Sequence, residues 1–345
     1  MPRSKKPYPT IADVARAVEL SPTTVSFVIN NVPYANIPEE TRERVWQAVK
    51  ALGYRRNAAA KVLRTQQTHT IGFVTDEVAT TPFAGQVIKG AQELAWDNEK
   101  MLIIINAGGI PSVLEAAVEV LLDRQVEGII YAAVYHQEVQ PPRNLWEVPT
   151  VLLDCYCADR SLPSVVPDEV GGGRMATELL IAQGHRRIGF INLMADLPAA
   201  VGRLQGYREA LAMSSIAFDP TLVRHGNAQA DGGYEQIQQL MRLDSPPTAV
   251  FCGNDRTAMG AYDGLRDLGL RVPQDVSIVG FDNQEIIAAY LRPALTTVLL
   301  PHYDMGRWAV QHLLNQIEHP AATTPLQHLE PCTSIIRESI RPIAY

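Results

Sequence analysis

Polar side chains close three apolar runs of the sequence, at the places where buried strands would end. Asp154 ends TVLLD, Asn254 and Asp255 end FCGND, and Asp282 ends IVGFD. Arg203 opens RLQGYREAL, beyond a fourth run, GFIN. Carboxylates accept hydroxyl hydrogens and a guanidinium donates in a fork, so this set suits a polyhydroxylated ligand. These residue types favour binding of a small molecule over catalysis.

Some of these residues have a second interpretation. Asp255 precedes RTAMGAYDGL and is equally well placed to be the N-cap of a helix there. For the other strand-end residues the alternative is plain solvation in a loop. Asp76 and Asp168 are weaker candidates for the same site, and Phe83, in TTPFAG, could cover an apolar ring face.

Motifs for catalysis or metal binding are missing from the sequence. It contains no GxSxG, HExxH or P-loop. GGGRMA (171–176) lacks the strand–GxGxxG–helix context of a nucleotide site, and a turn before a helix explains it better. Cys155 and Cys157 could bind a metal, but no further Cys or His lies at finger spacing. We therefore expect four reduced, mostly buried thiols, no cofactor and no enzyme activity.

Apolar runs separated by amphipathic stretches organise the chain after Thr70. Continuous Val/Ile/Leu runs of this kind are typical of parallel sheets covered by helices on both faces. With 345 residues and 46% hydrophobic content, the chain is long enough for two such lobes and a smaller module. The predicted strands are TIGFVT, MLIIIN, EGIIYAAV, PTVLLD, RRIGFIN, TAVFCGND, DVSIVGFD and TTVLLP.

Charge is distributed unevenly between this body and the residues before it. The formal net charge is −7, yet residues 1–70 hold 11 Lys and Arg against 5 Asp and Glu, a net of +6 that leaves −13 for the remainder. A basic module on an acidic body is expected when the module contacts phosphates. No window approaches 18 uncharged apolar residues, and the basic start leads into no apolar signal segment. We expect a cytoplasmic, nucleoid-associated protein without a membrane segment.

Three short helices are predicted in the basic module. Thr10 can cap the first, with Asp13 completing a capping box and apolar Ile11, Val14, Ala15 and Val18 facing inward. Ser21 and Pro22 suit the N-cap and first position of the second. In that helix Val25, Val28 and Ile29 share one face, while Phe27 points almost the opposite way as an exposed aromatic.

The third helix is predicted from about Pro38 to Leu52, and Gly53 ends it. Its expected buried stripe is Val45, Trp46, Val49 and Leu52. A helix-turn-helix followed by a third helix is typical of a DNA-reading module. The alternative is a small helical subdomain for protein contact.

The run TIADVARAVELSPTTVSFVINN, followed by IPEETRERVWQAVKALGYRRNAAAKVLRT, resembles the head of the LacI/GalR (lactose-repressor) family of bacterial transcription regulators. The resemblance implies that Pro22, Thr23 and Phe27 read base edges. The family usually has Arg at the third position, which can pair with guanine, whereas Phe27 can pack on a thymine methyl. The alternative is that Phe27 packs on the hinge or on a dimer partner.

The resemblance also implies contacts to the DNA backbone and minor groove. The polar residues that it places against phosphates are Thr10, Ser21, Thr24, Ser26, Asn30 and Tyr54. A hinge helix over 57–65 would fold on DNA with Asn57 as its cap, Ala60 at the groove and Leu63 wedged between base pairs. Arg56 departs from the family, which usually has proline before the Asn, and a plain basic linker is the alternative.

The body resembles the same family through GHRRIGFI, RLQGYREAL, FCGNDRTAMGAYDGLRDLGLRVPQDVSIVGFDN and LTTVLLPHYDMGRWAV. The implied fold is that of periplasmic binding proteins: two doubly wound lobes, crossovers near 161–167, 290–295 and 326–332, and a ligand at the strand ends. The implied domains are 1–56, a hinge at 57–69 and a body at 70–345, with lobe 1 about 70–163 and 293–326 and lobe 2 about 164–292 and 327–345. Asp154, Arg203, Asn254 and Asp282 occupy sugar-contacting positions of the family.

The predicted function is a repressor of carbohydrate-use genes. It would bind pseudo-palindromic double-stranded DNA as a homodimer, with helices around 86–96 and 112–122 at the interface. The chain shows no leucine heptad at its end, so a dimer is expected rather than a tail-linked tetramer. A sugar or sugar derivative is favoured over a purine as the effector. The alternatives are a solute-binding protein without a DNA role, and an enzyme built on two α/β lobes.

Overall fold

The computed structural model describes residues 9–33, 35–55, 67–77, 84–320 and 325–343. The chain divides into two compact units, Met1–Thr68 and His69–Tyr345. We refer to them as the head and the body.

The head is a three-helix unit with a small apolar core. Its helices are α1 (Ile11–Ala17), α2 (Pro22–Ile29) and α3 (Glu39–Leu52). Gly53 ends α3 with φ of 65°, a left-handed conformation that glycine adopts without strain. The predicted inward faces of α1 and α2 are confirmed, since Val14, Val25 and Val28 are buried.

The predicted stripe of α3 is partly wrong. Val45 is fully buried, but Trp46 is 46% exposed and Leu52 is 39% exposed. Against two short helices, α3 needs to bury only a narrow face, on which Ala48 and Val49 accompany Val45. Trp46 lies one residue, about 100°, around the helix from Val45 and so leaves that face.

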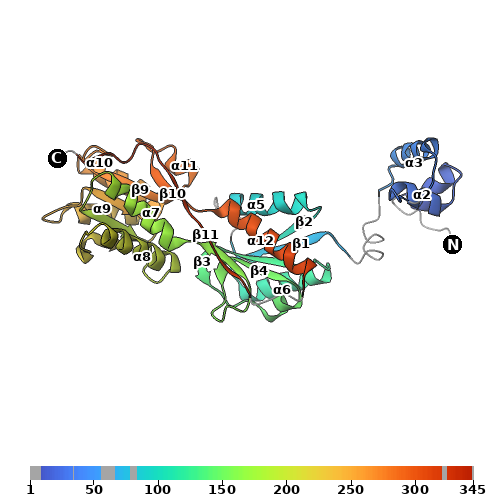
Figure 1. Cartoon of the computed structure of the whole chain (residues 1–345), viewed down its shortest axis with the longest axis horizontal. Helices are drawn as coiled ribbons and strands as arrows, with labels where there is room; N and C mark the ends of the chain where they lie inside the picture. Colours follow the sequence, from blue (N-terminus) through green and yellow to red (C-terminus); the bar gives the residue numbers. More distant parts are fainter. Residues whose placement is uncertain (1–8, 34, 56–66, 78–83, 321–324, 344–345) are drawn as a thin grey trace. The chain divides into compact units, whose positions relative to one another are not determined.

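The body contains two six-stranded sheets, each with helices on both faces (Figure 1). Lobe 1 holds the sheet β11-β5-β4-β3-β1-β2, and every recorded pair in it is parallel. Its elements are β1 (Thr70–Thr75), α5 (Ala84–Asp97), β2 (Met101–Asn106), α6 (Pro111–Asp123), β3 (Ile129–Glu138), η2 (Arg143–Glu147), β4 (Thr150–Tyr156), β5 (Ser164–Pro167), α12 (His302–Glu318) and β11 (Gln327–Glu330).

Lobe 2 holds the sheet β12-β10-β9-β8-β6-β7, in which β12 runs antiparallel to β10. Its elements are α7 (Glu169–Ala182), β6 (Ile188–Asn192), α8 (Pro198–Met213), η3 (Pro220–Leu222), β7 (Val223–His225), α9 (Ala230–Met241), β8 (Ala249–Cys252), α10 (Asp255–Asp267), β9 (Ser277–Asp282), α11 (Glu285–Ala288), β10 (Thr296–Leu299) and β12 (Thr333–Ile335). The eight predicted strands are confirmed. The shorter β5, β7, β11 and β12 were not among them.

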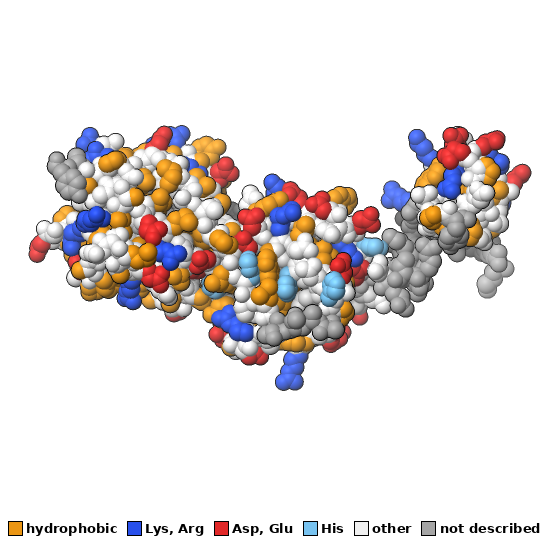
Figure 2. Space-filling model, viewed as in Figure 1, with side chains coloured by type: hydrophobic (Ala, Val, Ile, Leu, Met, Phe, Trp, Pro, Cys, Tyr) orange, Lys and Arg blue, Asp and Glu red, His pale blue; other side chains and the backbone are white. Residues whose placement is uncertain are grey.

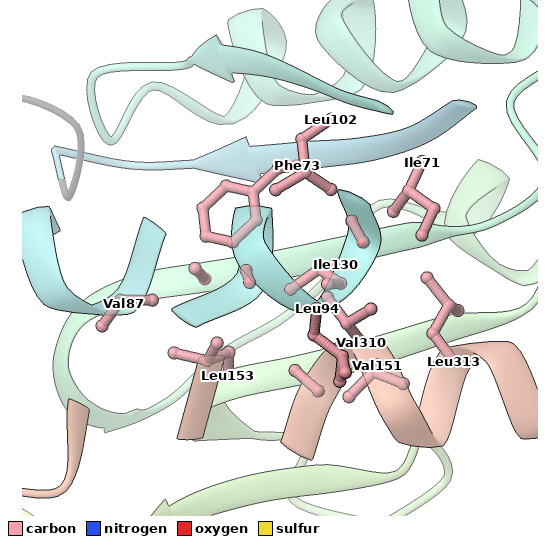
Figure 3. Packing of buried hydrophobic residues seen from close by; sticks show 14 of the residues in the cluster. Ile71, Phe73, Val87, Leu94, Leu102, Ile130, Val151, Leu153, Val310 and Leu313 are labelled. Atoms are coloured by element: carbon pink, nitrogen blue, oxygen red, sulfur yellow. The ribbon is translucent and has the colours of Figure 1, made fainter. Parts of the chain in front are cut away.

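Alternate residues of each strand face opposite cores. In lobe 1, Phe73 and Leu153 face α5 and α12 (Figure 3). Val74 and Leu152 lie on the other face of the sheet, against α6. Lobe 2 repeats the pattern, with α7 and α8 over one face and α9 and α10 over the other. Burial on both faces explains why these strands read as continuous apolar runs.

The predicted lobe boundaries need correction at three strands. Residues 164–167 and 327–330 pair with each other in the sheet of lobe 1, although the sequence placed both in lobe 2. Residues 296–299 pair with β9 in lobe 2, although the sequence placed them in lobe 1. The chain therefore passes between lobes after Pro167, Leu299 and Glu330. The four-residue strands β5 and β11 offer too little pattern to be told from a connection. Strand β10 was predicted as a strand, but its sequence does not indicate that its partner is β9.

None of the helices in the described ranges combines the length and apolar character needed to cross a membrane. Lysines, arginines and acidic residues are interspersed over the visible face of the body (Figure 2).

The four cysteines are free and buried. Within the described residues, no group of three or more His, Cys, Asp or Glu is arranged to hold a metal ion.

Candidate functional site

The start of α2 presents the residues expected to read bases. The Oγ of Ser21 accepts the backbone N–H of Thr24 at 3.0 Å, so the predicted cap is confirmed, and Pro22 occupies the first turn. Pro22 and Thr23 are exposed. Because Val25 and Ile29 anchor the opposite face in the core, this end of the helix is held with its polar side outward.

Phe27 is half-buried, so the expectation of a fully exposed aromatic is wrong. Phe27 directly precedes Val28, which is buried in the head core. Phe27 remains on the side of α2 that carries Thr23.

The other predicted head residues mostly hold local structure. The backbone N–H and hydroxyl of Thr10 both donate to Asp13, at 2.8 and 2.7 Å, and these bonds lower the pKa of Asp13. The Asn30 amide donates to the carbonyl and hydroxyl of Ser26. Tyr54 packs on the head core. Asn57, Ala60 and Leu63 of the expected hinge, together with Arg56 and Phe83, lie outside the described residues.

Arg203 is the centre of a buried charged cluster in the body. Its Nε donates to Glu169 Oε2 at 2.7 Å, and its Nη1 donates to the carbonyl of Gly253 and lies 3.8 Å from Asp282 Oδ1. The guanidinium carbon lies 3.7 Å from the centre of the Phe281 ring. Only 3% of Arg203 is exposed. A guanidinium so enclosed is fixed in direction.

Close packing of α7 on α8 brings Arg203 to Glu169. A Cβ on Gly173 of α7 would lie 2.6 Å from the Arg203 Cα, and one on Gly206 of α8 would meet the carbonyl of Val170. Glycine at these positions therefore lets the two backbones touch. The prediction that GGGRMA forms a turn is wrong, because residues 171–176 lie inside α7.

Asp154 and Asp282 complete the cluster from the ends of β4 and β9. Both have positive φ, 57° and 100°, conformations that are uncommon outside glycine and often mark functional positions. Burial, followed by the Glu169 carboxylate, raises the pKa of Asp154 well above its usual value. Burial also raises the pKa of Asp282 to about 6, against the influence of Arg203. The structure brings Asp154, Arg203 and Asp282 into one electrostatic cluster.

Asn254 and Asp255 differ in role from the sequence interpretation. Asn254 is the N-cap of α10, since its Oδ1 accepts the N–H of Thr257 at 2.8 Å. Its Nδ2 donates to the Ala228 carbonyl. Asp255 is not the cap: its buried carboxylate accepts the Thr297 hydroxyl at 2.6 Å and the Gln284 N–H at 2.7 Å. Asp255 therefore braces three segments of lobe 2.

The two weaker candidates also bind the protein itself. Asp168 caps α7 by accepting the N–H of Gly171 at 2.8 Å. Asp76 accepts the N–H of Val134 at 3.2 Å. After burial and Glu169, it also contributes to the raised pKa of Asp154, whereas Arg203 acts in the opposite direction. Asp76 thus lies beside the cluster, whereas Asp168 is the N-cap of α7.

Three residues near Arg203 were missed by sequence reasoning. Glu169 is 5% exposed, and despite burial the Arg203 guanidinium lowers its pKa. His136 Nδ1 lies 3.8 Å from Glu169 Oε1 and thereby links β3 of lobe 1 to α7 of lobe 2. Burial lowers the pKa of His302 to about 4. The available signal was GGG itself, because glycines inside a helix indicate a close neighbour for the residues beside them.

Comparison with known proteins gives the family. Residues 10–57 match the model of bacterial regulatory proteins of the lacI family, and residues 177–340 match a periplasmic binding protein-like domain. A ribose operon repressor of Haemophilus influenzae is 35% identical over 96% of this chain and 98% of its own length. The chain belongs to the LacI family of bacterial regulatory proteins.

Two solved structures show the same architecture as this LacI-family chain. A lac repressor dimer bound to operator has a TM-score of 0.80 at 27% identity, covering 97% of this chain and 99% of that one. A LacI-family regulator from Enterococcus faecium with bound ribose has a TM-score of 0.65 at 26% identity, covering 80% of this chain and all of that one. The predicted family and fold class are confirmed, and the chain is a DNA-binding transcriptional regulator.

Proposed function

We propose that this LacI-family regulator is a homodimeric repressor whose operator affinity is set by a sugar held at Asp154, Arg203, Asn254 and Asp282. The observation that carries the proposal is the buried cluster itself. Arg203 is fixed between two carboxylates of lobe 2, and the pKa of Glu169 reflects its partnership with Arg203 despite burial. Oriented polar groups of this kind recognise hydroxyls.

Contacts across the cluster provide the route from effector to DNA. Asp154 belongs to lobe 1, while Arg203 and Asp282 belong to lobe 2. An effector that bonds to both lobes favours one relative arrangement of them, and so can shift the population of DNA-competent dimers. The relative named as a ribose operon repressor makes pentoses the first sugars to test.

The dimer interface is proposed on an apolar surface of lobe 1. It comprises the exposed residues at the end of α5, the edge strand β2 and the start of α6: Trp96, Met101, Ile110 and Val113. Large apolar side chains exposed on neighbouring elements at one edge of a lobe are typical of a protein interface. A two-fold dimer would place two heads on the half-sites of a palindrome.

The proposed function is tested by selecting binding sites from a randomised DNA pool with the full chain. The selected site is then re-measured in the presence of individual sugars, with D-ribose first. We expect a palindrome whose affinity changes severalfold or more with one sugar. A pool without enrichment at moderate salt would contradict operator binding, and a selected site that no sugar affects would contradict the effector claim.

A further inference from the structure

Glu169 already binds the guanidinium of Arg203, the group that an anionic ligand would need for its own ion pair. Its carboxylate accepts the Arg203 Nε at 2.7 Å, and Asp282 lies 3.8 Å from Nη1, which also donates to the Gly253 carbonyl. Arg203 and Glu169 are 3% and 5% exposed. The positive charge of Arg203 is therefore already matched by carboxylates of the protein.

The surroundings of this pair are acidic as well. Asp154, 5% exposed, has one carboxyl oxygen, Oδ1, without a hydrogen-bond partner among the described residues. Its ionisation is opposed by burial and by Glu169, so the pKa of Asp154 is raised. Even with Asp154 neutral, two carboxylates remain for one guanidinium. The unpartnered oxygen suits a neutral hydroxyl, with which it can exchange a hydrogen bond.

Two further basic groups near the cluster also face carboxylates. His136 Nδ1 is 3.8 Å from Glu169 Oε1. The positive charge of Arg256 attracts Asp282 and opposes the rise of its pKa. A phosphate or carboxylate on the ligand would meet like charges that are buried and cannot be screened by salt.

We propose that Glu169 is a specificity-determining residue that restricts the effector to neutral polyhydroxylated molecules and rejects sugar phosphates and sugar acids. The inference rests on the proposed effector site and names the ligand class for it. Glu169 acts by repulsion, and by occupying the guanidinium that an anion needs. Selectivity through a repulsive element is a general device of specific sites.

The test is calorimetric titration of the full chain with matched neutral and anionic sugars. The pairs are D-ribose with D-ribose 5-phosphate, D-galactose with D-galacturonate, and D-glucose with D-glucuronate. The uronic acids replace a CH₂OH by a carboxylate of similar size, so steric exclusion is not the difference. The variant is Glu169→Gln, which keeps an oxygen acceptor for Arg203 Nε and removes the charge. Glu178→Gln, on the same helix and 49% exposed, is the matched control.

In the wild type we expect the neutral member of the binding pair to bind at least about 100-fold more tightly than its anionic partner. Glu169→Gln should narrow that ratio about tenfold or more, and Glu178→Gln should leave it unchanged. If Glu169→Gln does not fold, Asp282→Asn, which removes the charge on the other side of Arg203, should narrow the same ratio.

A merely structural Glu169 would weaken both members of a pair equally, and an unchanged ratio in a folded Glu169→Gln would overturn the inference. So would a wild type that binds an anionic sugar as tightly as its neutral partner, although a sugar effector would then stand. Failure of every sugar to bind the wild type would overturn the proposed effector itself, and this inference with it.

Discussion

The head and the body place their functional residues in opposite ways. In the head, the start of α2 is exposed and is fixed by one capping hydrogen bond and three buried aliphatic side chains of α2. In the body, the corresponding residues are buried and come from β4, α7, α8 and β9. The head presents an exposed, preformed surface to a large partner. The body buries polar groups, and their desolvation cost is offset only when packing brings their partners into contact.

This difference predicts where substitutions affect stability. Substituting an exposed residue at the start of α2 should have little effect on the fold, because water replaces the contacts of the lost side chain. Substituting a charged residue of the buried cluster leaves the opposite charge buried without its partner. Four substitutions, ordered by expected effect, test the contrast.

Arg203→Ala should have the largest effect. Removing the guanidinium leaves Glu169 and Asp282 buried without their cation, and breaking such a pair costs about 3–5 kcal/mol in the free energy of unfolding. Urea denaturation of the full chain measures it. Arg174→Ala is the control: Arg174 also bridges α7 to α8, at 3.5 Å from Glu209, but is 41% exposed and should cost about 1 kcal/mol or less. Equal losses for both would contradict the buried-pair account.

Gly173→Ala should cost about 1–3 kcal/mol, since its Cβ would overlap the backbone of Arg203 and push α8 away from α7. Sugar affinity should fall with stability, because the shift moves Arg203. Gly85→Ala, at the start of α5 with open space around its added methyl, should be neutral or stabilising by up to about 1 kcal/mol. A stable Gly173→Ala protein with unchanged sugar affinity would show that close helix packing does not position the cluster.

Phe27→Arg should alter base preference while leaving stability within about 0.5 kcal/mol. Arginine at this position can pair with guanine, so discrimination at one base pair of each half-site should change by about 1–3 kcal/mol. Repeating the site selection measures it. Gln47→Arg, which adds the same charge to the exposed face of α3, should raise affinity for all sequences equally. An identical selected site for Phe27→Arg and the wild type would remove Phe27 from the reading surface.

Ser21→Ala should lower the stability of the head by about 1 kcal/mol, through loss of the hydrogen bond from the Thr24 N–H. Hydrogen exchange of α2 amides in the full chain should show the loss, with the body amides unaffected. Thr23→Ala, two residues on and exposed, is the control, and the cap is unimportant if both variants exchange alike.

The same contrast explains what could be predicted from the sequence. The head was predictable because its signals are local: a cap, a proline at the first position and three buried aliphatics lie within nine residues, and the family motif covers the same stretch. The long strands were predictable because burial on both faces makes them continuous apolar runs. The lobe boundaries were wrong at β5 and β11, four-residue strands that were not predicted, and at β10, whose pairing with β9 is a long-range contact without a local signal.

The buried cluster was only partly predictable. Asp154 and Asp282 could be predicted because each ends an apolar run, and the carboxyl ends of parallel strands lie at one edge of a sheet. This pattern did not indicate Glu169. The role of Glu169 depends on its contact with Arg203, 34 residues away, which forms only when α7 packs on α8. For Asp255 the pattern left a ligand contact and an N-cap equally open and did not find the hydrogen bond to Thr297, because a buried contact of this kind has no local signature.

We propose that the buried cluster of the body and the DNA-reading head are coupled. The most direct test is to measure the affinity of one effector sugar twice, for the free protein and for the protein saturated with its selected operator. Linkage requires the two affinities to differ by the same factor by which that sugar changes operator affinity. We predict such a matched pair of factors, whichever direction the sugar acts. The same sugar affinity on and off the operator would contradict the coupling.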